Sequence, residues 1–274
     1  MKYCNVSPDG GLVPSQPGLS CNNQSYYVEK IRECNPITKT DAVFYQFKLD
    51  ENSSSSIKMV PDACMDILFC CDPKNPRATF YGKRLESKLV ELEPGYDYFG
   101  FRPYSERGLN SLNKTIIDLC NCEAPLKEVI KDNDIVDKIY CGKSFEERID
   151  IFEEFAKKHI IQEEKIIDFT NYIYRAICIS RGNIGMEDII DYTGYSERYI
   201  RKKFKQFYGI APKHFSRIIR FQSSLQMMLD HDNELLDVVY ESGFYDQAHF
   251  TREFKKLAST TPSQYKGSLI KKSV

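Results

Sequence analysis

The positively charged side chains of this sequence are concentrated in one short segment. Between residues 196 and 222 the chain has eight Lys and Arg residues and one acid, although its 274 residues carry a net charge of −1 overall. The basic residues are Arg198, Arg201, Lys202, Lys203, Lys205, Lys213, Arg217 and Arg220, and the acid is Glu197. A compact basic patch on a nearly neutral protein predicts a local site for an anionic partner such as nucleic acid.

The same segment is one half of an internal repeat. A shift of fifty residues aligns SERYIRKKFKQFYGIAPKHF (196–215) with DQAHFTREFKKLASTTPSQY (246–265). The shift pairs Phe204 with Phe254 and Lys205 with Lys255. A repeated unit of this size indicates that one supersecondary motif occurs twice.

Each copy has the pattern of two short helices joined by a turn. In the first copy, Ile189 and Ile190 predict a buried first helix. Gly194 ends that helix because a left-handed residue lets the chain turn sharply, and Ser196 caps the second helix. The second copy repeats these features with Val238, Val239, Gly243 and Asp246. The pattern predicts a helix-turn-helix whose second helix can enter a major groove.

A longer helix is predicted between the copies, over 212–229. Pro212 suits a first helical position. The stripe predicted to be buried comprises Phe215, Ile218, Ile219, Leu225 and Leu229. Such a helix is about 27 Å long, on the order of the 34 Å between successive major grooves on one face of a duplex. One chain should therefore read two adjacent grooves, with a bend in the DNA unless the helices sit at the full groove repeat.

Together these motifs resemble the AraC/XylS family of bacterial transcription regulators. GFYDQAHFTREFKK (243–256) followed by TTP (260–262) is similar to the family's signature in its second helix-turn-helix, and GYSERYIRKKFKQFYGIAPKHF (194–215) is similar to the first. The resemblance covers residues 165–274. One departure is Ser259, where the family usually has Gly; it is expected to strain or reshape the turn before Pro262 without abolishing the fold.

The resemblance implies two groups of DNA-contacting residues. Those implied to read base edges are Arg198, Arg201, Lys202, Gln247, Thr251 and Arg252. Those implied to contact the DNA backbone are Tyr199, Lys203, Lys205, Lys213, His249, Lys255 and Lys256. Arg and Lys suit guanine and Gln suits adenine, whereas phosphate contacts carry no sequence code. The first group could instead be the solvated face of an amphipathic helix, and Tyr199 and His249 suit helix packing equally well.

The first part of the chain, to about residue 105, has the pattern of short β-strands. Its apolar or alternating runs, 41–49, 59–71, 78–83 and 88–94, are separated by Asn, Ser, Pro and Gly. PDACMDILF (61–69) and ELEPGYDYFGFRPYS (91–105) resemble in architecture an N-terminal effector domain of one branch of the same family. That domain is a small cupin-type β-barrel followed by helices, and from about residue 110 the pattern here becomes helical.

Aromatic residues gather in this part and leave two interpretations open. The candidates to line an apolar effector pocket are Phe44, Phe69, Tyr81, Tyr98, Phe101 and Arg102. The aromatic side chains could instead form the core of the barrel, which is the favoured interpretation for each one taken singly. Arg102 suits either an anionic ligand or a surface position.

The ten cysteines do not form a recognisable metal or redox motif. The close pairs are Cys70-Cys71 and Cys120-x-Cys122, whereas zinc sites favour CxxC-like spacing and often include His, and the first His is His159. The expectation is reduced thiols, no cofactor and no metal, and neither a phosphate-binding Gly-rich loop nor a Ser/His/Asp set indicates an enzyme. A metal- or thiol-responsive regulator of the same architecture, or a cupin-type enzyme fused to a DNA-binding domain, remain the alternatives.

These observations predict an α+β protein of two domains. Residues 1–162 would form an effector-binding or dimerisation domain, with a β-rich cupin-like barrel to about residue 105 and trailing helices. Residues 163–274 would form an all-α DNA-binding domain with two helix-turn-helix motifs joined by a linker helix. Double-stranded DNA is the expected partner, and a small-molecule effector, RNA polymerase and a second copy of the chain are further candidates.

No membrane contact is expected. The longest apolar run, 67–71, is far short of the roughly 20 residues needed to cross a bilayer. Pro and Gly also interrupt the first twenty residues, where a signal peptide needs a continuous apolar core. The sequence therefore predicts a cytoplasmic protein.

Overall fold

The structure is a computed structural model that describes residues 13–19, 24–32, 42–51, 55–104, 115–130, 134–160, 168–229 and 234–270. Its strands are β1 (Gln24–Arg32), β2 (Ala42–Leu49), β3 (Ser56–Met59), β4 (Asp66–Cys70), β5 (Arg77–Tyr81), β6 (Lys88–Glu91), β7 (Asp97–Pro103) and β8 (Glu123–Pro125). Its helices are α1 (Leu126–Val129), α2 (Ile135–Cys141), α3 (Phe145–His159), α4 (Asp168–Ile179), α5 (Met186–Thr193), α6 (Glu197–Tyr208), α7 (Pro212–Leu229), α8 (Leu235–Glu241), α9 (Gln247–Ala258) and α10 (Pro262–Ile270).

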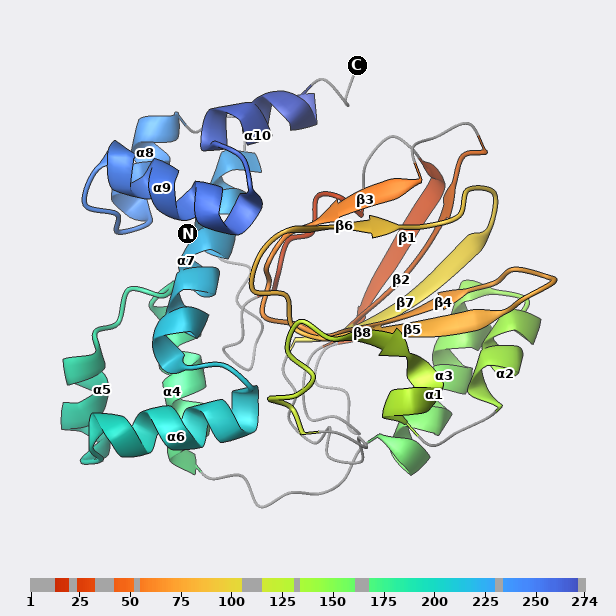
Figure 1. The fold of residues 1–274 in the computed structure, drawn as a ribbon, viewed down its shortest axis with the longest axis horizontal. Coiled ribbons are helices and arrows are strands. Elements are labelled where there is room, and N and C mark those ends of the chain that lie inside the picture. The colour runs from red at the N-terminus through yellow and green to blue at the C-terminus, as the bar shows by residue number, and fades with distance from the viewer. Residues whose placement is uncertain are drawn as a thin grey trace.

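The strands form two antiparallel sheets. Six of them lie in the order β1-β2-β7-β4-β5-β8, and β3 pairs with β6 in a separate two-stranded sheet (Figure 1). The predicted run 59–71 is split between β3 and β4, because Pro61 lacks an N–H to donate and Ala63 adopts a positive φ of 61°. β8 was not expected among the helices after residue 110, since three residues are too short to show an alternating pattern.

The central strands of the large sheet, β2, β7 and β4, are buried on both faces. On one face, Phe101 of β7 packs against Phe152 of α3 with ring centroids 4.5 Å apart, in a core that α1, α2 and α3 cover. Tyr98 of the same strand belongs to the opposite core, which includes Val90 of β6 and lies between the two sheets. Successive residues of a strand point to opposite faces, so one strand supplies both cores.

The helices α4 to α10 form the second part of the fold, and α7 runs between its two halves (Figure 1). Phe215 in the first half of α7 lies 5.6 Å, centroid to centroid, from Phe204 of α6. Phe221, further along α7, lies 5.0 Å from Phe254 of α9. Each helix-turn-helix therefore has its own core, and a single helix is common to both.

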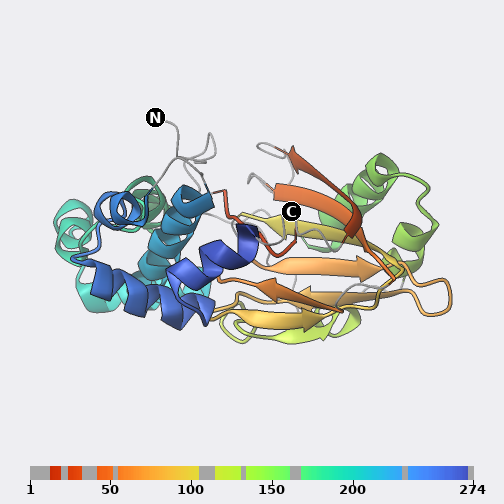
Figure 2. The same ribbon diagram turned by 90° about the horizontal axis from the view of Figure 1, so that it is seen from above.

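The α+β architecture with a β-rich part, trailing helices and a helical C-terminal part is confirmed; Figures 1 and 2 both show the strands and the last seven helices side by side. The predicted boundary between residues 162 and 163 lies outside the described residues, as does residue 105. Within the described ranges, no helix is both long and apolar enough to span a bilayer.

The β-rich part packs directly against α7. Gln222, which is fully buried, donates from Nε2 to the carbonyl oxygen of Pro61 at 2.7 Å and accepts at Oε1 from the N–H of Ser15 at 2.8 Å. The hydroxyl of Tyr174 on α4 donates to the carbonyl of Tyr104 at 2.9 Å. Side chains of the helical part thus form hydrogen bonds with backbone groups of the segments before α1, so the two parts of the fold share a packed interface.

Candidate nucleic-acid interface

The second helix of each motif begins and ends in the same way. The side chain of Ser196 accepts a hydrogen bond from the N–H of Tyr199, and that of Asp246 accepts from the N–H of His249, as N-caps do. At the other end, Gly209 and Ser259 take the left-handed conformation, with φ of 75° and 56°. The expectation that Ser259 strains its turn is consistent with this φ, because a side chain there is unfavourable.

Both helices bury one face and expose the other. Ile200 and Phe204 of α6, and Phe250 and Phe254 of α9, are at most 1% exposed. Of the residues implied to read bases, Arg198, Arg201, Lys202, Gln247 and Arg252 are exposed and Thr251 is half-buried. Of those implied to contact the backbone, Tyr199, Lys205, Lys213, Lys255 and Lys256 are exposed, and Lys203 and His249 are half-buried. The fold thus brings the two groups onto the outer surfaces of α6 and α9 and the start of α7.

Tyr199 and His249, for which the sequence left both DNA contact and helix packing open, are exposed in part and packed in part. Tyr199 is 39% exposed, yet its ring stacks on Phe169 of α4 at 5.7 Å between centroids. His249 meets the ring of Phe244 edge-on at 5.5 Å. Each therefore packs against its own motif while keeping an edge at the surface.

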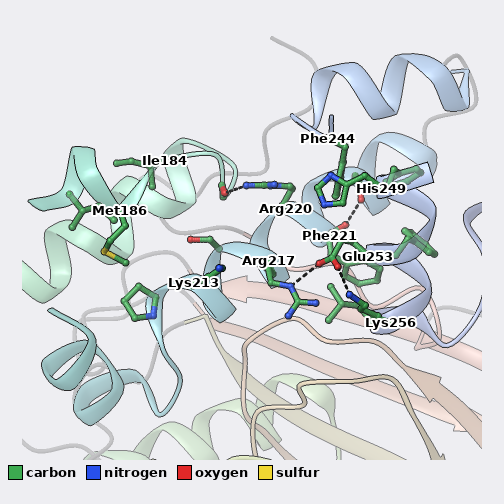
Figure 3. Close-up of a pocket in the computed structure, with 18 of the residues that line it drawn as sticks. Ile184, Met186, Lys213, Arg217, Arg220, Phe221, Phe244, His249, Glu253 and Lys256 are labelled. Carbon is green, nitrogen blue, oxygen red and sulfur yellow. Dashed lines mark hydrogen bonds and ion pairs between the residues drawn. The ribbon is translucent and has the colours of Figure 1, made fainter. Parts of the chain in front are cut away.

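A groove of about 640 Å³ lies between the two motifs, beside α7 (Figure 3). Its charged lining comes from three helices: Glu197 and Arg201 of α6; Lys213, Arg217 and Arg220 of α7; and His249, Glu253 and Lys256 of α9. Basic groups outnumber acidic ones along it, so the groove has the electrostatic character of an anion site.

Glu253 connects α7 and α9 across this groove. Its carboxylate accepts from Arg217 Nε at 2.8 Å and from Lys256 Nζ at 2.8 Å, as the dashed lines in Figure 3 show. Burial alone would raise the pKa of Glu253, but the hydrogen bonds from Lys256 and Arg217 outweigh it, and the pKa is lowered. Glu253 is therefore ionised at neutral pH and occupies part of the groove with a negative charge.

Arg220 is only partly satisfied by the protein. One of its terminal nitrogens donates to the carbonyl of Gly182 at 2.8 Å, and its guanidinium lies 5.6 Å from the centroid of the Phe244 ring. Its Nε is buried and has no hydrogen-bond partner among the described residues. Most buried polar groups in proteins are hydrogen-bonded, so this nitrogen stands out as an exception.

Sequence reasoning missed the roles of Arg217, Arg220 and Glu253. Lys213, Arg217 and Arg220 recur at helical spacing and so share one face of α7, which is a signal that could have been used. Glu253 gave no such signal, because it is 36 residues from Arg217 and meets it only in the folded chain.

The six candidate pocket residues do not line one pocket. Phe44, Phe69 and Phe101 fill the core against α3, whereas Tyr81 and Tyr98 lie in the core between the sheets, because alternate strand residues point to opposite faces. Only Tyr81 and Tyr98 of the six line the cavity of about 320 Å³ between the sheets.

Arg102 is buried rather than open to a ligand or to solvent, being 3% exposed. Its guanidinium donates through Nε and a terminal nitrogen to the two oxygens of Asp66, each at 2.9 Å, and its other terminal nitrogen lies 3.5 Å from Asp62. Burial alone would lower the pKa of Arg102, but Asp66 and then Asp62 raise it well above the ordinary value. Arg102 is thus committed to two internal carboxylates.

The adjacent cysteines at the end of β4, Cys70 and Cys71, are poorly suited to thiol chemistry. Cys70 and Cys71 are buried, and burial raises the pKa of both thiols, that of Cys71 to about 11. A thiol that stays protonated is a weak nucleophile and a weak metal ligand. Among the described residues, no three His, Cys, Asp or Glu side chains are grouped to hold a metal ion.

The loop between β5 and β6 touches the carboxyl ends of both α6 and α9. Lys83 is 1% exposed, and its Nζ donates to the carbonyl of Tyr208, the last residue of α6, at 2.8 Å. The N–H of Ser87 donates to the carbonyl of Leu257 in the last turn of α9 at 2.9 Å, and its hydroxyl donates to Ser259. We call residues 83–87 the bridging loop, because its first and last residues, Lys83 and Ser87, contact the ends of the two helices.

Known proteins match the helical part of the chain. A family model described as a helix-turn-helix domain matches residues 189–268. A probable transcription factor, PqrA of Proteus vulgaris, is 32% identical over 83 residues, which are 30% of this chain and 68% of that protein. An uncharacterized HTH-type transcriptional regulator of Staphylococcus aureus is 26% identical over 112 residues, or 41% of this chain.

The match to the staphylococcal protein is local. This chain spans only 15% of the length of that relative. Among solved structures, ToxT of Vibrio cholerae is 15% identical, with 88% of this chain and 98% of that chain covered and a TM-score of 0.44.

Proposed function

The chain belongs to the AraC/XylS family of transcription regulators, and from that premise we propose that it binds duplex DNA sequence-specifically, with α6 and α9 as its reading helices. One observation carries the proposal. Two equivalent capped helices bury their apolar faces against a common helix, α7, and leave polar and basic faces exposed. A recognition helix in a major groove needs this combination of a fixed backbone and a free outer face.

In this proposal the exposed side chains divide into two roles. Those that read bases are Arg198, Arg201 and Lys202 of α6 and Gln247, Thr251 and Arg252 of α9. Those that contact the sugar-phosphate backbone of the DNA are Tyr199, Lys203, Lys205, Lys213, His249, Lys255 and Lys256. Arg and Lys match the acceptors of guanine and Gln matches adenine, with about 1–3 kcal/mol of discrimination for each good pair.

The equivalent positions of the repeat supply a direct test of this division. After the preferred duplex has been selected from a random library, Lys202→Ala and Arg252→Ala should relax the preference at particular base pairs. Lys205→Ala and Lys255→Ala should weaken binding to all sequences alike and lower the salt dependence. Selection and sequencing with each variant measures both effects, and an identical uniform loss in all four variants would refute the division of roles.

Regulation would act through the β-rich part. A small molecule that binds the cavity of about 320 Å³ between the sheets, whose lining includes Arg77, Tyr81 and Tyr98, would change DNA binding by favouring one arrangement of the two parts. The contacts of that part with Gln222 and with the ends of α6 and α9 provide the route. Thermal shift of the full chain against a panel of small molecules would identify such an effector, because a ligand of the native state raises its stability.

The remaining partners are those that the family resemblance implies. A second copy of the chain and RNA polymerase are both proposed, and sedimentation of the purified chain checks the first. With this role on DNA, a cytoplasmic location is part of the same proposal.

A further inference from the structure

The two reading helices turn opposite flanks towards the groove between them. From α6, Glu197 and Arg201 line it, and their equivalents fifty residues later, Gln247 and Thr251, do not. From α9 the polar lining residues are His249, Glu253 and Lys256, and their equivalents Tyr199, Lys203 and Gln206 do not line it. Two helices related by a translation show opposite flanks to the space between them, whereas a twofold axis would show the same flank twice.

The reading faces of α6 and α9 consequently point the same way. Lys202 and its equivalent Arg252 are both exposed, and both helices run towards the bridging loop in Figure 1. A duplex lying across both faces must pass over the groove between them. The part of B-form DNA that lies between two successive major grooves on one side is a minor groove with its two phosphate backbones.

The groove already holds an anion, which is the carboxylate of Glu253. Arg217 and Lys256 both bind it, as the dashed lines in Figure 3 show. The neighbouring Arg220 has a buried Nε with no partner among the described residues. The groove therefore combines a carboxylate bound by two cations with a donor that is not yet used.

We infer that this groove is a phosphate seat, in which Arg217 and Arg220 take the DNA backbone between the two major grooves and Glu253 competes with that backbone for Arg217 and Lys256. The inference rests on the proposed function and deepens it. Arg217 and Arg220 become phosphate-positioning residues in addition to those on α6 and α9. Glu253 becomes an internal competitor that weakens binding to any duplex, because its carboxylate must share its two cations with phosphate.

Salt dependence measures the number of phosphate contacts directly. The probe is a fluorescein-labelled duplex of 30 random base pairs, which needs no knowledge of the preferred sequence, and the readout is anisotropy of the full chain with duplex between 50 and 300 mM NaCl. The logarithm of the binding constant falls linearly with the logarithm of the salt concentration. Arg217→Gln should lower the magnitude of that slope by about 0.9, the value for one phosphate contact. Glu253→Gln should tighten binding at the lowest salt by about fivefold, the order expected for freeing partly exposed cations from an ion pair.

Two neighbouring residues of α1 provide controls that are matched in charge. Lys127→Gln removes one positive charge and Glu128→Gln one negative charge, at exposed positions far along the chain from the groove. The double variant with both Arg217→Gln and Glu253→Gln should lose much of the tighter binding that Glu253→Gln gives alone, because Glu253 acts partly through Arg217.

The outcomes separate the groove from the general proposal. If wild type fails to bind the random duplex even at 50 mM NaCl, the proposed function fails and the phosphate seat with it. If wild type binds but Arg217→Gln matches Lys127→Gln and Glu253→Gln matches Glu128→Gln, the seat alone is refuted. A lowered melting temperature of Glu253→Gln without tighter binding would show that the ion pairs only join α7 to α9.

Discussion

Arg102 illustrates how a single residue can be committed by its surroundings. Asp66 receives two bonds from its guanidinium, and the second carboxylate, Asp62, also accepts from Gln16 Nε2 at 2.7 Å and from the N–H of Cys64 at 3.0 Å. Burial raises the pKa of Asp62. The group is a buried pair of acids around one base, which anchors the loop that meets Gln222 of α7.

Replacing Arg102 by Leu should therefore be severe. Two buried carboxylates would lose their cation, and removing one partner of a buried ion pair costs about 3–5 kcal/mol. Urea unfolding at neutral pH measures this loss. Arg77→Leu is the control, since Arg77 is partly exposed and its pairs with Glu93 and Asp72 contribute at most about 1 kcal/mol.

The pH dependence of this variant has a definite sign. Burial raises the pKa of Asp62 and Arg102 lowers it, so without Arg102 this pKa should lie further above its unfolded value and the native state should bind more protons than the unfolded state. A raised folded pKa gives stability that is present at low pH and lost as pH rises. The deficit of Arg102→Leu should thus shrink as pH falls from about 7 towards 4, and a deficit that stays constant would contradict the buried-charge explanation.

At the scale of elements, the ends of the helices are where the repeated motifs turn and where the helical part contacts the β-rich part. Gly209 ends α6 at a φ of 75°, and a Cβ built there would lie 2.7 Å from Cys120 Sγ and 3.0 Å from the carbonyl of Ile116. Gly194 ends α5 at a φ of 68° and has nothing within 4 Å of the same position. Both positions require a left-handed residue, but only Gly209 is also pressed against the β-rich part.

Alanine at these two glycines should separate the two effects. Gly194→Ala should cost about 1 kcal/mol, the penalty for a side chain in the left-handed region. Gly209→Ala should cost more, about 2–3 kcal/mol, because the neighbouring loop must also move. Urea midpoints of the two variants measure the difference. Equal losses of stability would show that residues 116–120 can move away from a side chain at position 209 at no cost.

The helical elements were the most predictable part of the molecule. The linker helix spans 212–229 as expected, and the caps at Ser196 and Asp246 lie where the repeat placed them, because capping, glycine stops and helical periodicity are local signals. The pocket was less predictable. Phe101 and Tyr98 belong to the same aromatic run in the sequence, yet their side chains lie on opposite faces of the sheet. The groove was not predictable from spacing alone, because Arg217 and Glu253 are brought together only by tertiary packing.

At the scale of the whole molecule, the bridging loop makes the β-rich part a support for both reading helices. The ammonium of Lys83 lies at the carboxyl end of α6, where the helix dipole favours a cation, and its Nζ is also 5.7 Å from the Tyr208 ring centroid. Ser87 holds the corresponding end of α9. The two motifs are therefore coupled through the loop as well as through α7.

Lys83→Met should weaken this coupling without removing the apolar packing of the side chain. The carbonyl of Tyr208 would lose a buried donor, at a cost of about 1–3 kcal/mol. Hydrogen exchange should become faster at the last turn of α6, and the melting temperature should fall. Lys88→Met is the control, because Lys88 is exposed and pairs only with Glu123 among the described residues; equal effects in both variants would deny Lys83 this role.

The shortness of the bridging loop also limits how far apart the two helix ends can lie. From the carbonyl of Tyr208 to that of Leu257, a path through an extended Lys side chain, residues 83–87 and two hydrogen bonds reaches at most about 26 Å. Equivalent points in successive major grooves of a straight duplex are about 34 Å apart. While both contacts persist, only a duplex curved towards the protein can present its grooves to both helices at once. Stiff sequences would therefore be disfavoured at base pairs that no side chain touches.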